Sequence, residues 1–93
     1  AVMRTQQMAR LTVPGRLACQ LLSFAADHGE VQEDGSIRIR LRLSQQELAD
    51  LLGVTRASIS SALRGFQQQG VLSKATGQRI VIHDRAALEA LCE

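Results

Sequence analysis

Residues 44–64 read SQQELADLLGVTRASISSALR, and this stretch decides the fold. Ser44 followed by Glu47 is a capping-box pattern, which predicts that a short helix begins here and runs over residues 45–52. Gly53 is expected to end this helix, because glycine tolerates the positive φ that a sharp turn needs. The first half of the stretch therefore predicts a short capped helix followed by a tight turn.

A second helix is predicted after the turn. Thr55 can cap it, residues 56–69 have helical spacing, and Gly70 lies just beyond its end. Two helices that cross near a right angle through a three- or four-residue turn need apolar residues on both helices and a small residue at the crossing. The stretch supplies these residues together, at Leu48, Ala49, Leu52, Val54, Ile59 and Ala62. This combination predicts a helix-turn-helix over residues 45–69.

The rest of the chain adds four elements to this pair. Helical spacing, strand alternation and turn residues predict a core helix from Thr12 to Gly29, a strand through residues 37–43, a hairpin of residues 71–74 and 79–83, and a short helix over residues 85–91. Their order indicates a mainly helical α+β fold, a winged helix-turn-helix with a small antiparallel sheet. The wing is expected at residues 71–83.

Composition limits the protein to one modest domain. The chain has 93 residues, of which 45% are hydrophobic and 22% charged, and its net charge of +2 permits a nucleic-acid partner without requiring one. No run of apolar residues is long enough to span a membrane. Cys19 and Cys92 lie far apart without CxxC spacing, so we expect neither a zinc site nor a disulfide, but reduced thiols in a cytoplasmic protein.

The second helix of the pair has one apolar side and one polar side. Helical geometry puts Ile59, Ala62, Leu63 and Phe66 on the same side, so the opposite side is expected to be exposed. A recognition helix enters the major groove of DNA by its N-terminal turns. The residues expected nearest the bases are therefore Arg56, Ala57, Ser58, Ser60 and Ser61, with Arg64 nearer the phosphates.

Arg56 is the one side chain of this set that can read a base firmly. An arginine can donate two hydrogen bonds to O6 and N7 of guanine, which is worth about 1–3 kcal/mol of discrimination, whereas a serine hydroxyl pairs with almost any base edge. Two other readings stay open: Arg56 is simply exposed to solvent, and the serines are small residues on an exposed helix. Lys74, Gln78 and Arg79 flank the predicted wing tip, where phosphate contact and plain exposure are equally compatible with the sequence.

The chain resembles the C-terminal DNA-binding domain of the CRP/FNR family of bacterial transcription regulators. The segments that carry the resemblance are PGRLACQLLSFA and LRLSQQELADLLGVTRASISSALRGFQQQGVLSKATGQRIVIHD, so the likeness covers about residues 13–83. It implies that residues 12–93 are the DNA-binding domain and that residues 1–11 are the end of a long dimerisation helix. An effector-binding β-roll would precede that helix and bind a cyclic nucleotide or another small signal. No cofactor is expected in this domain.

The resemblance also implies roles for single residues. It makes Arg56 the reader of a guanine, puts Thr55 and Ser58 at positions that contact phosphate or base edges, and places Arg64 near phosphate. The start of the first helix, which contacts the DNA backbone in the family, is matched by Ser44, Gln45 and Gln46. Well-studied members have a glutamate where this chain has Ala57 and an arginine where it has Ser61. The usual half-site of the family is therefore not expected to apply.

The expected partners are duplex DNA, a second copy of the full-length protein, and RNA polymerase, but not a membrane. No nucleophile, base and oxyanion arrangement and no Gly-rich phosphate loop can be assembled, so we expect neither an enzyme nor a metal site. The low net charge leaves an alternative open, a winged-helix module that docks another protein without binding DNA. Single-stranded nucleic acid is less favoured, because stacking needs exposed aromatic side chains and the chain has only Phe24 and Phe66.

Overall fold

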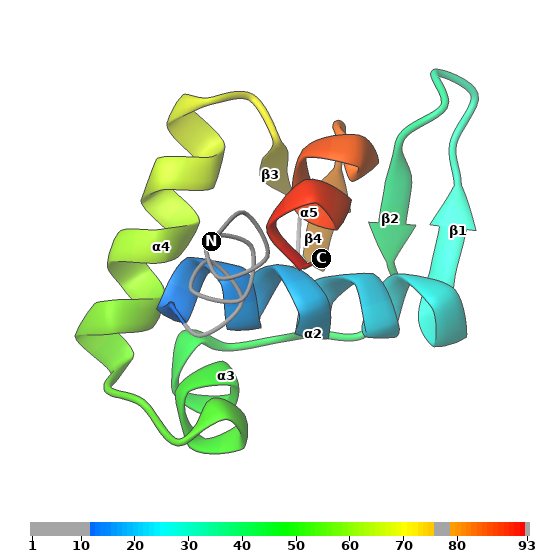
Figure 1. Cartoon of the computed structure of the whole chain (residues 1–93). Coiled ribbons are helices and arrows are strands. Elements are labelled where there is room, and N and C mark those ends of the chain that lie inside the picture. Colours follow the sequence, from blue (N-terminus) through cyan, green and yellow to red (C-terminus); the bar gives the residue numbers. More distant parts are fainter. Residues whose placement is uncertain (1–11, 76–78, 93) are drawn as a thin grey trace.

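The structure, a computed structural model, describes residues 12–75 and 79–92. Within these ranges the chain forms four helices and a four-stranded antiparallel sheet, which confirms the predicted winged helix-turn-helix (Figure 1). The elements are α2 (Val13–His28), β1 (Gly29–Val31), β2 (Ile37–Ile39), α3 (Gln45–Leu52), α4 (Arg56–Gln68), β3 (Leu72–Ala75), β4 (Arg79–Ile82) and α5 (Arg85–Cys92). The expected end of a dimerisation helix at residues 1–11 lies outside the described residues.

Helix α2 lies at the centre of the domain. Its first turn is capped by Thr12, since the backbone amide of Gly15 donates to Oγ1 of Thr12 at 3.2 Å. Leu17, Ala18 and Leu21 on this helix are each 0% exposed. Helices α3, α4 and α5 and strands β1 and β2 all pack against it (Figure 1). This helix, the longest among the described residues, thus supplies the surface on which most of the other elements assemble.

The sheet joins strands from both halves of the domain in the order β1-β2-β4-β3. Ile82 in β4 lies opposite Ile37 of β2 on one side and opposite Leu72 of β3 on the other. The predicted hairpin is present as β3 and β4, in which Leu72–Ala75 pairs with Arg79–Ile82. It is therefore attached directly to the strand that precedes the helix-turn-helix.

The predicted strand through residues 37–43 was wrong beyond Ile39. Nε of Arg79 donates to the carbonyl oxygen of the next residue, Arg40, at 3.2 Å, so a side chain occupies this acceptor at the point where the strand ends. Leu41 and Leu43 leave the sheet and pack, half-buried, against the core. Leucine and arginine alternate in this segment, and such alternation is typical of a strand. Half-buried residues of a loop can alternate in the same way, so the pattern did not distinguish the two.

The turn between α3 and α4 has the predicted geometry. Gly53 adopts φ 69° and ψ 36°, and the amide of Val54 donates to the carbonyl of Ala49 at 3.0 Å. Gly70 also has a positive φ, of 74°, just after α4. Helix α4 ends one residue earlier than predicted, at Gln68, with Gln69 as its cap. Local sequence signals thus placed both ends of the helix pair to within one residue.

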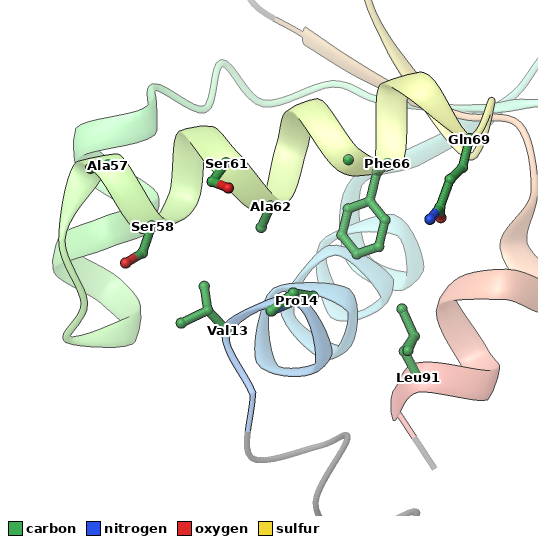
Figure 2. Close-up of a pocket in the computed structure, with 10 residues that line it drawn as sticks. Val13, Pro14, Ala57, Ser58, Ser61, Ala62, Phe66, Gln69 and Leu91 are labelled. Atoms are coloured by element: carbon green, nitrogen blue, oxygen red, sulfur yellow. The ribbon is translucent and has the colours of Figure 1, made fainter.

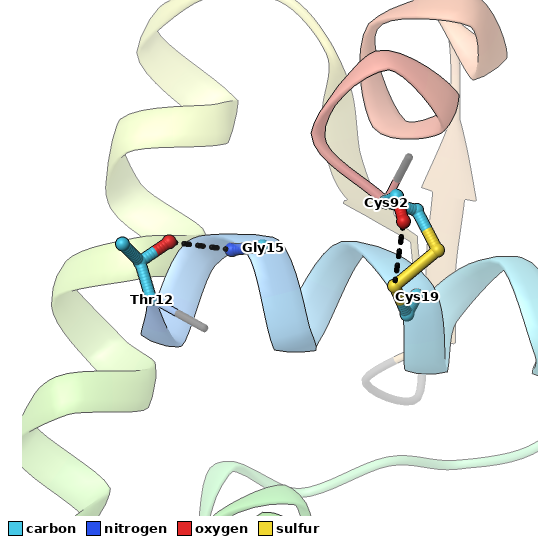
Figure 3. Close-up of a disulfide and its surroundings, with 4 residues drawn as sticks. All are labelled: Thr12, Gly15, Cys19 and Cys92. Carbon is cyan, nitrogen blue, oxygen red and sulfur yellow. Dashed lines mark hydrogen bonds between the residues drawn. A yellow bond between two sulfur atoms is a disulfide. The ribbon is translucent and has the colours of Figure 1, made fainter. Parts of the chain in front are cut away.

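The two cysteines correct a prediction. Cys19 in the middle of α2 and Cys92 at the end of α5 form a disulfide, with their Cα atoms 5.0 Å apart (Figure 3). They are not the reduced, incidental thiols that their spacing had suggested. The two residues are 73 positions apart in the chain and meet because α5 packs along α2. The spacing of the two cysteines could not show the disulfide, since the bond depends on how α5 packs against α2.

The first prediction concerns the left-handed turn at Gly53. We expect Gly53→Ala to lower the free energy of unfolding by about 1–2 kcal/mol, because a Cβ at positive φ approaches the following carbonyl oxygen. Gly65→Ala is the matched control: Gly65 lies inside α4 and a Cβ there would meet nothing within 4 Å. It should stabilise the domain by roughly 0.5–1 kcal/mol. Urea denaturation measures both, and equal effects at the two positions would contradict the account of the turn.

Candidate nucleic-acid interface

Helix α4 presents one face to the core and another to solvent. Ile59, Ala62, Leu63 and Phe66 are buried, as their spacing predicted. Arg56, Ala57, Ser61 and Arg64 are exposed, and Ser58 and Ser60 are half-buried. All six candidate contact residues on α4 therefore lie away from the fully buried side of the helix. Their side chains, except those of the two arginines, are short.

The start of α4 is held by two hydroxyl groups that bind each other. The amide of Ser58 donates to Oγ1 of Thr55 at 3.1 Å, and the Thr55 hydroxyl donates to Oγ of Ser58 at 2.9 Å. Thr55 is exposed but has this structural task as the helix cap. The Ser58 hydroxyl still has its own hydrogen to donate to an acceptor outside the domain. Ser58 is thus better placed than Thr55 to donate to DNA.

The start of α3 is built in the same way. The amide of Glu47 donates to Oγ of Ser44 at 3.0 Å, so Ser44, a candidate contact residue, is also a helix cap. Nε2 of Gln46 donates to Oδ1 of Asp50 at 2.9 Å, which orients that amide along the exposed side of the helix. Gln45 is half-buried at the first position of α3. The N-terminal end of a helix carries a partial positive charge that favours anions.

A cleft of about 320 Å³ brings several candidate residues together from three parts of the chain. Leu43 and the start of α3 form one wall, Arg56 comes from the start of α4, and Lys74 comes from the wing strand β3. The lining residues are Leu43, Ser44, Gln45, Gln46, Arg56 and Lys74. Of these six described residues two are cations and none is acidic. Two cations beside a helix N-terminus suit a phosphate group.

Arg79, the other wing candidate that the structure describes, is not among the residues that line this cleft. Arg79 is half-buried and its Nε is bound to the carbonyl of Arg40, so part of its guanidinium serves the sheet. Gln78 lies outside the described residues. Lys74 is exposed and is the wing residue that the structure places beside the helix-turn-helix.

A second hollow runs along the other flank of α4, and sequence reasoning did not foresee it. This groove, of about 660 Å³, separates α4 from the start of α2 and the end of α5. Figure 2 shows side chains of α4 facing Val13 and Pro14 across it, with Leu91 of α5 at one end. The lining residues are Val13, Pro14, Ala57, Ser58, Ser61, Ala62, Gly65, Phe66, Gln69 and Leu91. The groove forms where α2, α4 and α5 meet, and the sequence carries no local signal of that meeting.

The described residues contain no group of three or more histidine, cysteine, aspartate or glutamate side chains that could hold a metal ion. No helix in the same part of the chain is long and apolar enough to cross a membrane.

Known proteins share both the sequence and the fold of this domain. The family model described as "Crp-like helix-turn-helix domain" matches residues 15–91. The chain belongs to the Crp-like helix-turn-helix family. Relatives that carry this domain are transcription regulators, and this relationship favours DNA binding over the protein-docking alternative.

Two curated relatives illustrate the relationship. The chain is 38% identical over 76 residues to the CRP-like cAMP-activated global transcriptional regulator of Mycobacterium tuberculosis, covering 82% of this chain and 33% of the relative. It is 31% identical over 84 residues to the nitrogen fixation regulation protein FixK of Azorhizobium caulinodans, covering 90% of this chain and 34% of that protein. The Crp-like domain thus spans about a third of these relatives, which are regulators rather than enzymes.

Solved structures agree with this placement. The CO-dependent transcription factor CooA from Carboxydothermus hydrogenoformans superposes with a TM-score of 0.82 at 26% identity. The match covers 99% of this chain and 42% of CooA. The fold of the described residues is therefore also found in a solved transcription factor.

The second prediction tests the cap of α4. Thr55→Ala should lower the free energy of unfolding by about 1 kcal/mol, because the amide of Ser58 loses its acceptor. Thr55→Ser keeps the hydroxyl and should stay close to the wild-type value. Chemical denaturation of the two variants provides the comparison. An unchanged stability of Thr55→Ala would mean that the hydroxyl pair does not hold the start of the helix.

Proposed function

We propose that this domain binds duplex DNA sequence-specifically, with the first turns of α4 in the major groove and the wing on the adjacent backbone. The observation that carries the proposal is the cleft in which Arg56, Lys74 and the start of α3 meet. A phosphate held there by Lys74 and the start of α3 would leave Arg56, at the start of α4, beside the base edges. Contacts to phosphate position a protein on DNA, whereas contacts to base edges specify the sequence.

Base reading is proposed to rest mainly on Arg56. It is exposed at the first position of α4 and can reach a guanine with two hydrogen bonds. Ala57 can contact a thymine methyl group, and the hydroxyls of Ser58, Ser60 and Ser61 add weaker contacts. Arg64, further along the helix, is proposed to contact phosphate. With one strong base contact, the shape of the DNA and the spacing of two half-sites would carry much of the specificity.

The whole regulator is proposed to act as a dimer in the bacterial cytoplasm. Two copies of α4 would enter successive major grooves about 34 Å apart on a pseudo-palindrome. Residues 1–11 would be the end of the dimerisation helix. The mycobacterial relative is named as cAMP-activated, which supports a small-molecule signal bound outside this domain. Contact with RNA polymerase is a further proposal that follows from the same relationship.

Selection from a random-sequence duplex pool tests the central proposal. The chain fused to a short dimeric coiled coil should enrich a pseudo-palindrome with a guanine at matched positions, and binding should weaken as salt rises. Failure to enrich any sequence, or binding that ignores ionic strength, would contradict sequence-specific DNA binding.

The third prediction separates base reading from general charge. Arg56→Ala should relax specificity at one base pair of each half-site and cost about 1–3 kcal/mol on the preferred sequence. Arg85→Ala is the matched control, because Arg85 is an exposed arginine on α5 that pairs with Glu89 instead. Its removal should leave the selected sequence unchanged. Competition binding against single-base variants of the operator measures both, and an unaltered preference in Arg56→Ala would refute the assigned role.

The fourth prediction concerns Lys74. Lys74→Ala should weaken binding to preferred and unrelated sequences by the same factor and reduce the slope of log K against log salt by about 1. Lys74→Arg keeps the charge and should keep the slope. Fluorescence anisotropy titrations over a range of salt concentrations give the slope. A loss confined to the preferred sequence would instead make Lys74 a base reader.

A further inference from the structure

We propose that Cys19 and Cys92 form a reversible dithiol–disulfide site whose oxidation locks α5 onto α2 at the end of the groove beside α4. The molecules that would react there are low-molecular-weight thiols and disulfides. The inference rests on the proposed function in one respect. A bacterial DNA-binding regulator works in a reducing compartment, where a disulfide, when present, is usually a transient or redox-sensing one.

The packing of α5 brings the two cysteines within bonding reach. Cys19 lies in the middle of the central helix and Cys92 is the last residue of α5, yet their Cα atoms are 5.0 Å apart. This separation lies within the range that disulfides adopt without movement of the backbone. Figure 3 shows the bond joining the end of α5 directly to α2. The bond therefore affects how firmly α5 is held against α2.

Both oxidation states fit the same site. The two cysteine side chains are half-buried rather than sealed in the core, so a small thiol or disulfide can reach the sulfur atoms. The carbonyl oxygen of Cys92 lies 3.7 Å from Sγ of Cys19. In the reduced form the Cys19 thiol can donate to this oxygen, which gives its hydrogen an acceptor. Reduction thus leaves no need for the core to rearrange.

The end of α5 depends on this bond more than its start does. Asp84 caps the helix, with the amide of Ala87 donating to Oδ1 at 3.1 Å, and Leu88 is 0% exposed. Beyond Leu88, the half-buried Leu91 and the disulfide supply the attachment. The helix has only eight residues, a length at which an isolated helix is marginal in water. Reduction should therefore fray the last turn.

Fraying would reach the groove beside the recognition helix. Leu91 closes one end of that groove, next to Phe66 and Gln69 of α4, and it immediately precedes Cys92 (Figure 2). The same groove extends along α4 to Ala57 and Ser58 near the proposed DNA-reading turn. The oxidation state of the cysteines would thus set whether the groove is closed at its Phe66 end.

The reaction is a two-step exchange that needs no metal or cofactor. A thiolate of one cysteine attacks a small disulfide, forms a mixed disulfide and releases one small thiolate. The thiolate of the other cysteine then attacks the cysteine sulfur of the mixed disulfide and releases the second. Two electrons pass from the protein to the small disulfide, and the two protons of the cysteine thiols end on the two small thiols. Reduction by small thiols is the reverse.

Glutathione buffers test the proposal on the whole chain. Samples equilibrated at increasing ratios of reduced to oxidised glutathione are quenched with acid, alkylated, and weighed by mass spectrometry to count thiols. We expect the chain to pass from disulfide to two thiols within this series. Hydrogen exchange on the same samples should show amides near the end of α5 exchanging at least about tenfold faster in the reduced form. Amides of α3, distant from the bond, serve as the internal control.

Three outcomes would overturn the proposal. The cysteines could fail to pair in oxidised glutathione, the disulfide could survive in fully reduced glutathione, or α5 could exchange equally fast in both forms. The double variant C19S/C92S should show the fast exchange of α5 in every buffer, which assigns the response to these two sulfurs. If that variant does not fold, the wild-type comparison still decides. None of these measurements uses DNA, so a failure here is distinct from a failure of DNA binding.

Discussion

The burial of one face of α2 is the constraint on which the rest of this domain depends. Leu17, Ala18 and Leu21 are completely buried, and the other helices and two strands gather around them. The Arg16 guanidinium adds a polar link by donating to the carbonyl of Leu52 at the end of α3. Because both helices of the helix-turn-helix pack against α2, the orientation of α4 is a property of the assembled core.

The candidate interface separates two tasks that DNA recognition requires. Helix caps and hydroxyl pairs hold the starts of α3 and α4 rigidly, while Arg56 and Lys74 supply positive charge where those starts meet the wing. Ser58 and Ser61 are too short to reach far, so they leave a shallow surface between the helix and the DNA. Such a surface favours firm positioning with limited base reading, because most of its charge lies where phosphates would run.

The covalent link between α2 and α5 couples the last residues of the chain to this arrangement. It joins two elements that already pack together, and so it changes how firmly the C-terminal helix is held without changing the fold. The groove along α4 is bounded by residues from the beginning, middle and end of the described chain, namely Val13, Phe66 and Leu91. The end of the C-terminal helix and the recognition helix therefore face the same groove.

The helix-turn-helix could be predicted from the sequence alone, because its signals are local. Ser44 and Thr55 cap helices within three residues of themselves, and Gly53 adopts a conformation that its own backbone permits. The buried face of α4 followed from helical geometry. Three features could be seen only in the folded domain: the strand that begins at Ile37 stops at Ile39, Cys19 meets Cys92, and Lys74 joins Arg56 in one cleft. Each of these features depends on residues that lie far apart in the chain and are brought together by packing of the elements around α2. The periodicity of a sequence carries no information about which distant residues will meet.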